Sequence, residues 1–295
     1  MRSGVPNIIV QTWETLDVPD KWKSCPLTVF EKHTIEEITE NKLDPISSLD
    51  DQYKYVLLTN EDRRSFIARH FPQYLDTFNK LRHKIQEADM IRYAWLHVNG
   101  GIYMDLDYEV LKPLNTLFSY DSPVYFIQSP NTDGYITNSF MASKPGCEIW
   151  LEALAEIDKR INQGKEWWAK GKHLEVMMTT GPGMLQKVIQ KTKTPYMILP
   201  KNLINNLSVK DFKCMPSRDD LDSYLFPLEG CSWGGWDSML YNWVFQNWEI
   251  LVIIIIVLLI LLTVFLVWYF KKNWKMTRKE TITIRDENIA TKDLT

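Results

Sequence analysis

The sequence predicts an α/β domain followed by one transmembrane helix. Short apolar runs rich in β-branched residues alternate with segments of helical periodicity along residues 1–249, a pattern typical of layered α/β folds. Residues 250–270 form a run of 21 residues without a charged side chain, which as a helix spans the roughly 30 Å apolar core of a bilayer. We therefore predict a globular domain over 1–249, a transmembrane helix over 250–270 and a basic, flexible tail over 271–295.

Local patterns give the expected elements. β-branched or apolar runs predict strands, whereas apolar residues recurring every three or four positions predict helices. The strands are expected at residues 7–12, 53–58, 102–106 and 124–128, and the helices at 61–70, 73–83, 85–98, 148–161 and 184–190. In such a fold, ligands bind at the carboxyl ends of the strands.

The charge balance argues against nucleic acid as a partner. The formal net charge of the chain is −3 at pH 7. Residues 271–295 contain seven Lys or Arg and four Asp or Glu, a net charge of +3, so residues 1–270 carry −6. A protein that binds nucleic acid must instead present excess positive charge to the phosphates.

Charges around the apolar run indicate the orientation of the span. Lys271, Lys272 and Lys275 follow it closely, whereas residues 230–249 contain no Lys or Arg. By the positive-inside tendency, the tail is cytoplasmic and the domain faces the lumen or the outside. Residues 1–13 show no apolar signal-peptide core. Either the span directs translocation or the domain lies in the cytosol, and the sequence leaves both open.

The acidic residues after the strand at 102–106 are the first candidates for chemistry. This strand runs into Asp105-Leu106-Asp107, and in extended backbone the two carboxylates point to one side while Leu106 points to the other. Paired carboxylates bind hard divalent ions, which in turn bridge phosphates that the aspartates would repel. By itself the pattern also occurs at solvated turns.

Two further charged residues precede this strand. Asp89 and Arg92 lie three positions apart on a predicted helix, so they share one face and could hold a polar ligand or form a surface ion pair. Asn99-Gly100-Gly101 ends the helix, because these residue types tolerate a positive φ, and turns the chain back onto the strand. We expect Asp89, Arg92, Asp105 and Asp107 to share one cleft.

The segment ADMIRYAWLHVNGGIYMDLD resembles the sugar-binding region of the DxD glycosyltransferases of family 32, which includes yeast α-1,6-mannosyltransferases and mannosyl-inositol-phosphoceramide synthases. Other segments are similar to this family in the same order over residues 6–237. They are the opening strand at 6–13, the mid-domain loops at Asn138-Ser139, 143–146 and 180–182, and the closing segment at 229–237.

This resemblance implies a GT-A-type nucleotide-diphospho-sugar transferase fold and a metal-dependent, retaining hexosyltransferase. It favours transfer of mannose from GDP-mannose to a membrane-associated acceptor such as an inositol-phosphoceramide-like lipid, in the Golgi or ER membrane. The divalent cation is expected to be Mn²⁺, with Mg²⁺ as the alternative. From the residues alone, the donor nucleotide, the sugar and the choice between a lipid and a glycan acceptor stay open.

The resemblance also assigns roles to residues, though it assigns no nucleophile or base. A tryptophan would stack on the nucleotide base, an Asp–Arg pair would hold the donor sugar, and the two aspartates of D-x-D would hold the metal and the ribose or diphosphate. A closing Ser-Trp would cover the diphosphate, and a glutamate and the serine are further candidate metal contacts. In that order, these residues are Trp13; Asp89 and Arg92; Asp105 and Asp107; Ser232 and Trp233; and Glu229 with Ser232.

Two departures from the family pattern leave an alternative open. Val10 and Gly234 stand where related sequences have His. A sugar-nucleotide-binding or scaffold protein that kept the fold and lost turnover would explain both departures. A haloacid-dehalogenase phosphatase also ends a strand in D-x-D, but it requires Thr or Val two residues after the second Asp, where this chain has Glu109.

Aromatic residues just before the apolar run bear on the acceptor. Trp236, Tyr241, Trp243 and Phe245 lie between the closing segment and the span. We expect them to rest against the bilayer surface, where aromatic rings settle at the depth of the headgroups. This expectation favours a lipid acceptor.

Overall fold

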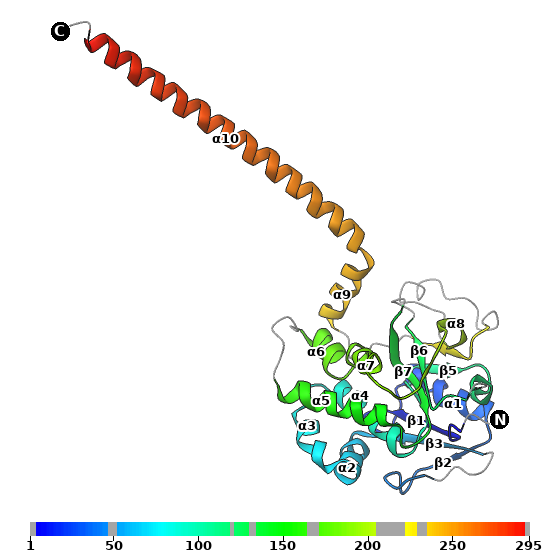
Figure 1. The fold of residues 1–295 in the computed structure, drawn as a ribbon. Coiled ribbons are helices and arrows are strands. Elements are labelled where there is room, and N and C mark those ends of the chain that lie inside the picture. Colours follow the sequence, from blue (N-terminus) through cyan, green and yellow to red (C-terminus); the bar gives the residue numbers. More distant parts are fainter. Residues whose placement is uncertain are drawn as a thin grey trace. The chain divides into compact units, whose positions relative to one another are not determined.

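The computed structural model describes residues 4–46, 52–118, 121–129, 134–163, 171–204, 222–228 and 235–292. The chain divides into two compact units, residues 1–234 and 235–295. The first unit contains the β-sheets, and the second consists of helices α9 and α10 (Figure 1).

A seven-stranded mixed sheet forms the centre of the first unit. The strand order is β2-β3-β1-β4-β7-β6-β8, with β1, β2, β3 and β4 parallel, β7 antiparallel to both β4 and β6, and β8 parallel to β6. The bounds are β1 Ile8–Thr12, β2 Ile35–Glu37, β3 Tyr53–Leu58, β4 Gly101–Met104, β6 Val124–Gln128, β7 Ile136–Ser143 and β8 Met197–Leu199. The α/β fold class predicted from the sequence is therefore confirmed.

Both faces of this sheet are covered, which explains the continuous apolar runs of its central strands. In β1, Ile8 and Val10 belong to one hydrophobic cluster, whereas Ile9 between them belongs to the other. All five residues of β1 are buried. A strand buried on both faces needs apolar side chains at successive positions, as the sequence of β1 supplies.

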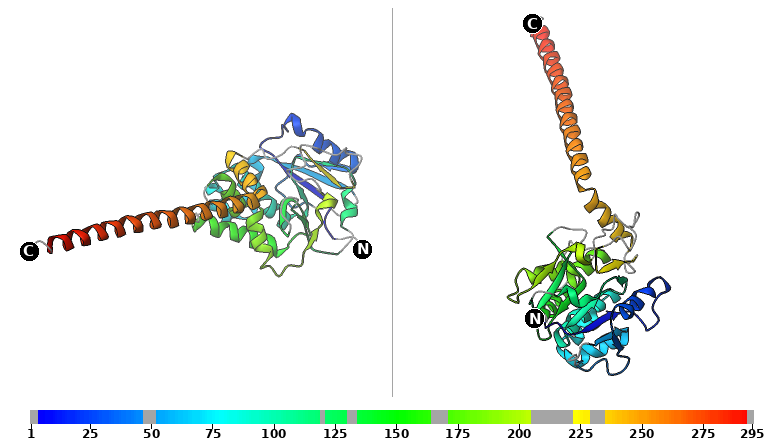
Figure 2. Two further views of the ribbon diagram at one scale, coloured as in Figure 1. Left: turned by 90° about the horizontal axis from the view of Figure 1, so that it is seen from above. Right: turned by 90° about the vertical axis from the view of Figure 1, so that its right-hand side faces the viewer.

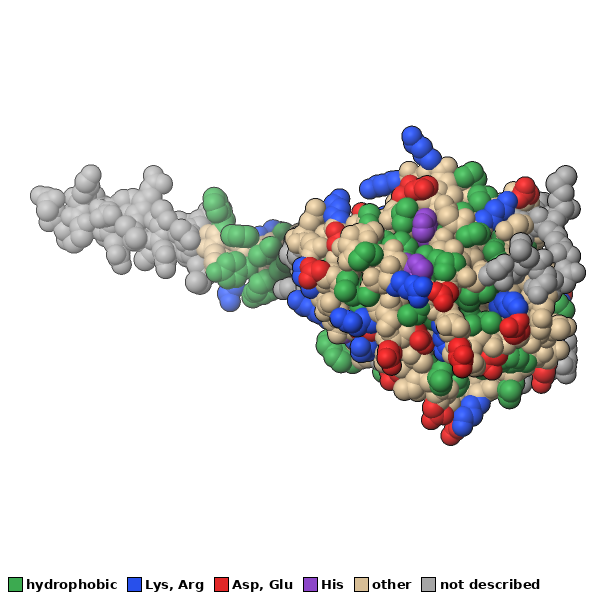
Figure 3. All heavy atoms as spheres, turned by 90° about the horizontal axis from the view of Figure 1, so that it is seen from below, with side chains coloured by type: hydrophobic (Ala, Val, Ile, Leu, Met, Phe, Trp, Pro, Cys, Tyr) green, Lys and Arg blue, Asp and Glu red, His purple; other side chains and the backbone are tan. Residues whose placement is uncertain are grey.

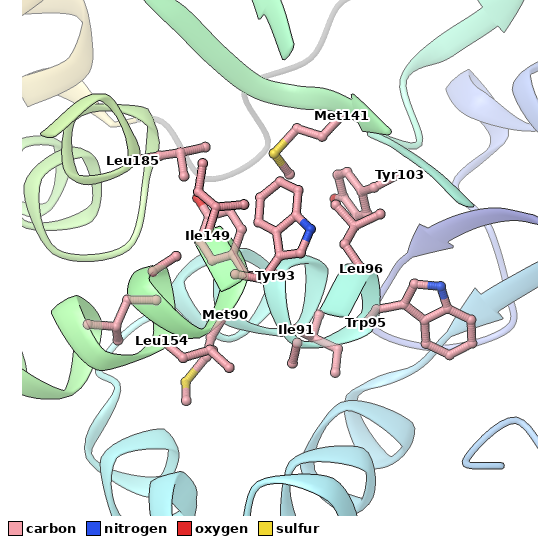
Figure 4. Packing of buried hydrophobic residues seen from close by; sticks show 14 of the residues in the cluster. Met90, Ile91, Tyr93, Trp95, Leu96, Tyr103, Met141, Ile149, Leu154 and Leu185 are labelled. Atoms are coloured by element: carbon pink, nitrogen blue, oxygen red, sulfur yellow. The ribbon is translucent and has the colours of Figure 1, made fainter. Parts of the chain in front are cut away.

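One face carries most of the helices. Side chains of α4 and α5 pack together there with Met141 and Tyr103 of the sheet (Figure 4). The cluster on this face includes residues of α2 (Asn60–His70), α3 (Leu75–Lys80), α4 (Lys84–Val98), α5 (Glu148–Asn162) and α7 (Pro182–Ile189). Helix α6 (Lys172–Thr179) contacts α4, α5 and α7.

The opposite face is covered by shorter elements (Figure 2). They include a two-stranded antiparallel sheet in which Tyr108 pairs with Pro227 across a long sequence separation. The elements are η1 (Asp20–Trp22), α1 (Ser24–Lys32), β5 (Tyr108–Val110), η3 (Leu114–Leu117), α8 (Lys201–Ile204) and β9 (Leu225–Pro227).

Two glycines make the turn from α4 into β4 possible. Gly100 and Gly101 have φ of +64° and +87°, which strain any residue with a Cβ. A Cβ at Gly101 would lie 2.5 Å from the carbonyl oxygen of Ile8, and one at Gly100 would lie 2.7 Å from that of Ser143. Glycine at both positions therefore lets β4 enter the sheet between β1 and β7.

Three local expectations differ from the structure. The helix expected at 73–83 is a 3-10 turn, η2 (Pro72–Tyr74), followed by α3, which ends before Leu81 takes an extended conformation. Asn138-Ser139, expected in a loop, lies within β7. The strand expected at 102–106 ends at Met104, because the chain turns at Leu106 and Asp107.

The second unit contains two helices, α9 (Trp236–Gln246) and α10 (Trp248–Lys292). The part of α10 from Trp248 to Trp274 is long and apolar enough to cross a membrane. Its hydrophobic side chains are visible in Figure 3, whereas acidic and basic side chains are interspersed over the face of the first unit shown there. Residues 271–292, expected as a flexible tail, continue the helix.

Candidate active site

A pocket of about 420 Å³ lies at the carboxyl ends of β1 and β4. Thr12 and Trp13 reach it from the end of β1, and residues 105–107 reach it from the turn after β4. Parallel neighbouring strands present their carboxyl ends at the same edge of a sheet, so two segments far apart in sequence meet here. The pocket is lined by Thr12, Trp13, Glu14, Trp22, Arg63, Lys84, Ile85, Ala88, Arg92, Tyr103, Asp105, Leu106, Asp107 and Lys172.

The Asp105-Leu106-Asp107 turn is fixed by backbone hydrogen bonds at both ends. The amide of Asp105 donates to the carbonyl of Ser139 (2.8 Å), and the amide of Leu228 donates to the carbonyl of Asp107 (2.8 Å). The expected alternation of an extended strand is therefore wrong for this segment. All three residues of the turn nevertheless line the pocket.

Gln11 supports this turn from β1. Its side-chain nitrogen donates to the carbonyl of Asp105 (3.1 Å), and its side-chain oxygen accepts from the hydroxyl of Tyr55 (2.8 Å). Gln11 is completely buried, so both polar ends of its amide need a partner. The bonds connect the carbonyl of the first D-x-D residue to the centre of the sheet.

Arg92 connects two carboxylates. Its guanidinium lies 3.3 Å from Asp89 and 3.1 Å from Asp105, with the ring of Tyr103 4.3 Å away. It also donates to the carbonyls of Ala88 (3.1 Å) and Asn138 (2.7 Å). Arg92 is buried, so these bonds fix its position between α4, β4 and β7.

Asp89 is buried next to Arg92, is not among the pocket-lining residues, and belongs to a polar network. Its two oxygens accept hydrogen bonds from Asn138 and Thr180, both at 2.8 Å. Tyr93 completes the network, because its hydroxyl accepts from Asn138 (3.0 Å) and donates to the carbonyl of Thr180 (2.8 Å). This network joins α4 to β7 and to the end of α6.

The carboxyl groups at this site are more basic than usual. Burial raises the pKa of Asp89 to about 6, against the opposing effect of Arg92. Burial and the neighbouring Asp105 raise the pKa of Asp107 to about 7. Burial also raises the pKa of Asp105, although Arg92 and Tyr103 act in the opposite direction. Arg92 forms ion pairs with Asp89 and Asp105, whereas Asp107 forms none within the described part of the chain, so mutual repulsion opposes ionisation of all three carboxyl groups together.

A divalent cation fits this donor set. Oδ1 of Asp105 contacts the hydroxyl of Tyr103 (2.7 Å) and Arg92, while its Oδ2 and the Asp107 carboxylate have no side-chain partner among the described residues. In the same part of the chain, no three His, Cys, Asp or Glu side chains gather to hold a metal. The protein would thus supply two carboxylates, and water or phosphate oxygens the remaining ligands, as is common for Mg²⁺ sites.

Trp13 lies beside the carboxylates on the pocket wall. Its ring meets that of Trp22 edge to face, with 5.1 Å between the centroids, and its backbone amide donates to the carbonyl of Leu58 (3.0 Å). The side chain is half-buried, so part of the indole remains open to a ligand. A flat aromatic surface of this kind can stack on a nucleotide base.

The structure brings together Trp13, Arg92, Asp105 and Asp107 around one pocket, with Asp89 directly behind Arg92. Glu229, Ser232, Trp233 and Gly234 lie outside the described residues. Other lining residues were missed by the sequence analysis, notably Arg63, Lys172, Tyr103 and Trp22. In β4, Tyr103 and its neighbour Ile102 point to opposite faces of the sheet, and this alternation is a signal from which the position of Tyr103 could have been predicted. No local sequence signal marks Arg63 or Lys172.

Comparison with known proteins defines the class. Residues 36–123 match the family described as "Glycosyltransferase sugar-binding region containing DXD motif". The chain therefore carries this DXD glycosyltransferase region, and its mixed sheet with helices agrees with the α/β class expected from the resemblance.

Relatives and one solved structure extend this comparison. The chain is 28% identical over 251 residues to Inositol phosphoceramide mannosyltransferase 2 of Schizosaccharomyces pombe, covering 84% of the chain and 64% of the relative. It is 31% identical over 198 residues to Mannosyl phosphorylinositol ceramide synthase SUR1 of Saccharomyces cerevisiae, covering 67% and 44%. The chain thus spans less than two thirds of either relative. The solved structure "PaToxG Glycosyltransferase" has a TM-score of 0.44 and 16% identity, covering 63% of the chain and 69% of that structure.

Proposed function

We propose that this glycosyltransferase transfers mannose from GDP-mannose, with retention of configuration, to a membrane-associated inositol-phosphoceramide-like lipid. The observation that carries the proposal is the convergence of Asp105, Asp107, Arg92 and Trp13 on one pocket at the carboxyl edge of the sheet. The similarity to inositol phosphoceramide mannosyltransferases supports the choice of mannose and of a phosphoceramide acceptor.

The pocket residues suit the charges of such a reaction. Glycosyl transfer develops negative charge on the departing diphosphate, and a divalent cation, Mn²⁺ or Mg²⁺, when bound supplies electrostatic stabilisation for it. Asp105 and Asp107 would hold that cation, and Trp13 would stack on the guanine. Arg92, which stays protonated between Asp89 and Asp105, would orient the sugar hydroxyls with Asp89 behind it. We assign no side chain as nucleophile.

The helix before the span supports a membrane-associated acceptor. Trp236, Met239, Leu240 and Trp243 are exposed and follow the i, i+3, i+4, i+7 spacing of one helix face. Helix α9 leads directly into α10, whose first part can cross a bilayer. A helix with such a face beside a span suits the membrane interface, where Trp side chains are favoured. Of the other expected aromatics, Tyr241 is half-buried and the side chain of Phe245 lies outside the described residues.

A binding protein without turnover is the competing function, motivated by Val10 and Gly234. Val10 is buried in the hydrophobic core and does not line the pocket. A valine there therefore takes no side chain away from the pocket wall. This observation favours an enzyme over a binding protein that lost turnover.

The direct test uses the full chain in detergent micelles that contain inositol phosphoceramide. Incubation with GDP-mannose and Mn²⁺ should release GDP and yield a mannosylated lipid detectable by mass spectrometry, and EDTA should abolish both signals. Parallel reactions with UDP-glucose, UDP-galactose and a soluble oligosaccharide test the donor and the acceptor. Binding of GDP-mannose without release of GDP would favour the binding protein, and efficient transfer to the oligosaccharide would exclude the lipid acceptor.

The proposed location is the Golgi or ER membrane with the domain in the lumen. The basic residues after the span and their absence from residues 230–249 support this orientation. Protease treatment of sealed microsomes should leave residues 1–249 protected and remove only the segment after the span. Digestion of the domain in sealed vesicles would show that it faces the cytosol.

A further inference from the structure

Three basic side chains line the pocket and have no part in the mechanism above. Arg63 comes from α2, Lys84 begins α4 and Lys172 begins α6. Lys84 forms an ion pair with Glu87 at 2.8 Å, so its charge is largely matched. Arg63 and Lys172 form no ion pair with any described residue. Their charges are therefore available to a ligand.

Of these two residues, Arg63 gives the stronger evidence for a bound anion. The residue is 2% exposed, and its guanidinium donates to the carbonyls of Trp13 (2.7 Å) and Lys84 (3.2 Å). Its Nε is buried without a hydrogen-bond partner within the described part of the chain. Neutral carbonyls satisfy two donors but do not cancel the charge, and an unpaired buried charge is costly. An anion in the pocket would supply the missing counter-charge.

No acidic side chain nearby, among the described residues, forms an ion pair with Arg63 and so supplies this counter-charge. Burial lowers the pKa of Arg63, while Glu87 and Glu14 act in the opposite direction from a distance without forming ion pairs with it. Glu14 lines the pocket but is exposed, so solvent and salt screen its charge. Lys172 is half-buried on the pocket wall and lies one helical turn before Glu175, which instead lies near Arg82 and His83.

We propose that Arg63 and Lys172 form an anion subsite that binds a phosphate group, separate from the carboxylates that would hold the metal. The guanidinium offers donors in a fixed fork and the ammonium a point charge, a combination suited to phosphate oxygens. The phosphate belongs either to the donor diphosphate or to a phosphodiester in the acceptor headgroup. The second source rests on the proposed function, whereas the subsite itself does not.

Binding to the full chain in detergent tests the subsite. The metal-independent probe is inositol 1-phosphate in EDTA, and the donor probe is GDP with Mn²⁺. Lys172→Gln, Arg63→Gln and the charge-preserving Arg63→Lys are compared with Lys187→Gln, which removes a charge at an exposed position outside the pocket. The side chain of Lys172 is half-buried and forms no hydrogen bond or ion pair with any described residue, so its variant tests the subsite even if Arg63→Gln fails to fold.

We expect Lys172→Gln and Arg63→Gln to weaken one of the two probes about tenfold, with Arg63→Lys intermediate and Lys187→Gln unchanged. Weaker binding of GDP would assign the subsite to the donor diphosphate, and weaker binding of inositol 1-phosphate would assign it to the acceptor headgroup. Unchanged affinity for both probes in folded Lys172→Gln and Arg63→Lys would overturn the proposed subsite. This conclusion would hold whether or not the protein transfers mannose. Binding that depends on Lys172 without any sugar transfer would instead refute the proposed function alone.

Discussion

The two halves of the acidic site differ in how completely their polar groups are satisfied. Asp89 and Arg92 have side chains that are 4% and 2% exposed, and their partners come from α4, β7 and Thr180. Asp105 lines the pocket with a side chain that is 34% exposed, and its Oδ2 has no side-chain partner among the described residues. We call Asp89 with Arg92 the closed half of the site, because their polar groups have partners within the protein. We call Asp105 with Asp107 the open half, because part of their carboxylate oxygens has no such partner among the described residues.

This contrast separates two roles that the D-x-D region combines. A buried, fully bonded network specifies geometry, because moving any member leaves a polar group unsatisfied. Carboxylates whose oxygens lack partners repel each other in the metal-free protein. A bound cation would relieve this repulsion, so the arrangement favours binding of a cation. Arg92 couples the halves, since it contacts both Asp89 and Asp105.

The largest expected effect is on activity in the open half. Asp107→Asn removes one carboxylate from the proposed metal site, and we expect sugar transfer to fall by roughly 10²- to 10³-fold. The same change removes a charge that is unfavourable without metal, since the pKa of Asp107 is raised to about 7. The thermal midpoint of the metal-free protein should therefore rise slightly rather than fall.

Transfer rates and differential scanning calorimetry on the same preparation check both parts. Asp76→Asn is the matched control, because Asp76 lies on α3, has a side chain that is 76% exposed and is not among the pocket-lining residues. If Asp107→Asn keeps full activity, the proposed metal site is wrong. A large drop in its thermal midpoint would instead mean that the two halves do not differ as described.

In the closed half, the expected effect is on stability. Asp89→Ala leaves Arg92, Asn138 and Thr180 with fewer partners, and breaking a buried ion pair of this kind costs about 3 kcal/mol of unfolding free energy. Urea unfolding monitored by tryptophan fluorescence measures this loss. Asp89→Asn keeps an acceptor for Thr180 and should lose less. Equal stability of Asp89→Ala and wild type would show that the network does not hold the fold.

The response to pH sharpens the comparison further. The folded-state pKa values of Asp89 and Asp107, about 6 and about 7, lie above the ordinary value of 3.8. The metal-free folded state therefore keeps protons that the unfolded state has lost, and its stability should fall as pH rises from about 4 to about 7. Metal ligands must be deprotonated, so Mn²⁺ should bind more tightly across the upper part of this window.

Calorimetry of EDTA-treated and Mn²⁺-loaded protein at pH values of about 5, 6 and 7.5 checks this dependence. The gain in thermal midpoint from Mn²⁺ should be largest at the highest pH. In Asp107→Asn, the thermal midpoint of the metal-free protein should fall less steeply as the pH rises. A decline of the same slope in this variant would assign the pH dependence to other groups.

Much of the fold followed from local sequence patterns. The apolar runs gave β1 and β3 almost to the residue, because strands buried on both faces need continuous apolar sequence. The helix over 85–98 and the glycine turn after it also correspond to α4 and to Gly100 and Gly101. In contrast, β7 mixes polar and apolar residues, and the pairing of β5 with β9 depends on contacts far apart in sequence.

The candidate site was predictable where charge and spacing carry the signal. Asp105, Asp107 and Arg92 stand out in the sequence, whereas Arg63 belongs to a charged segment that looks like an exposed helix surface. Its burial follows from the packing of α2 against the end of β1 and the start of α4, where its guanidinium meets Trp13 and Lys84. Long-range packing of this kind leaves no local signal.

The smallest expected effect concerns α9 and extends the comparison from the pocket to the membrane. Trp236→Ser with Trp243→Ser removes two exposed aromatic rings from the apolar face of α9 and leaves the span in α10 unchanged. Because the span still anchors the chain, we expect only a severalfold loss of transfer to lipid in vesicles, with hydrolysis of GDP-mannose by water unaltered. Thr192→Ser, outside α9 and outside the pocket lining, serves as the control. An equal loss of hydrolysis would mean that the two rings support the domain itself, whereas unchanged lipid transfer would mean that α9 does not engage the membrane surface where the acceptor lies.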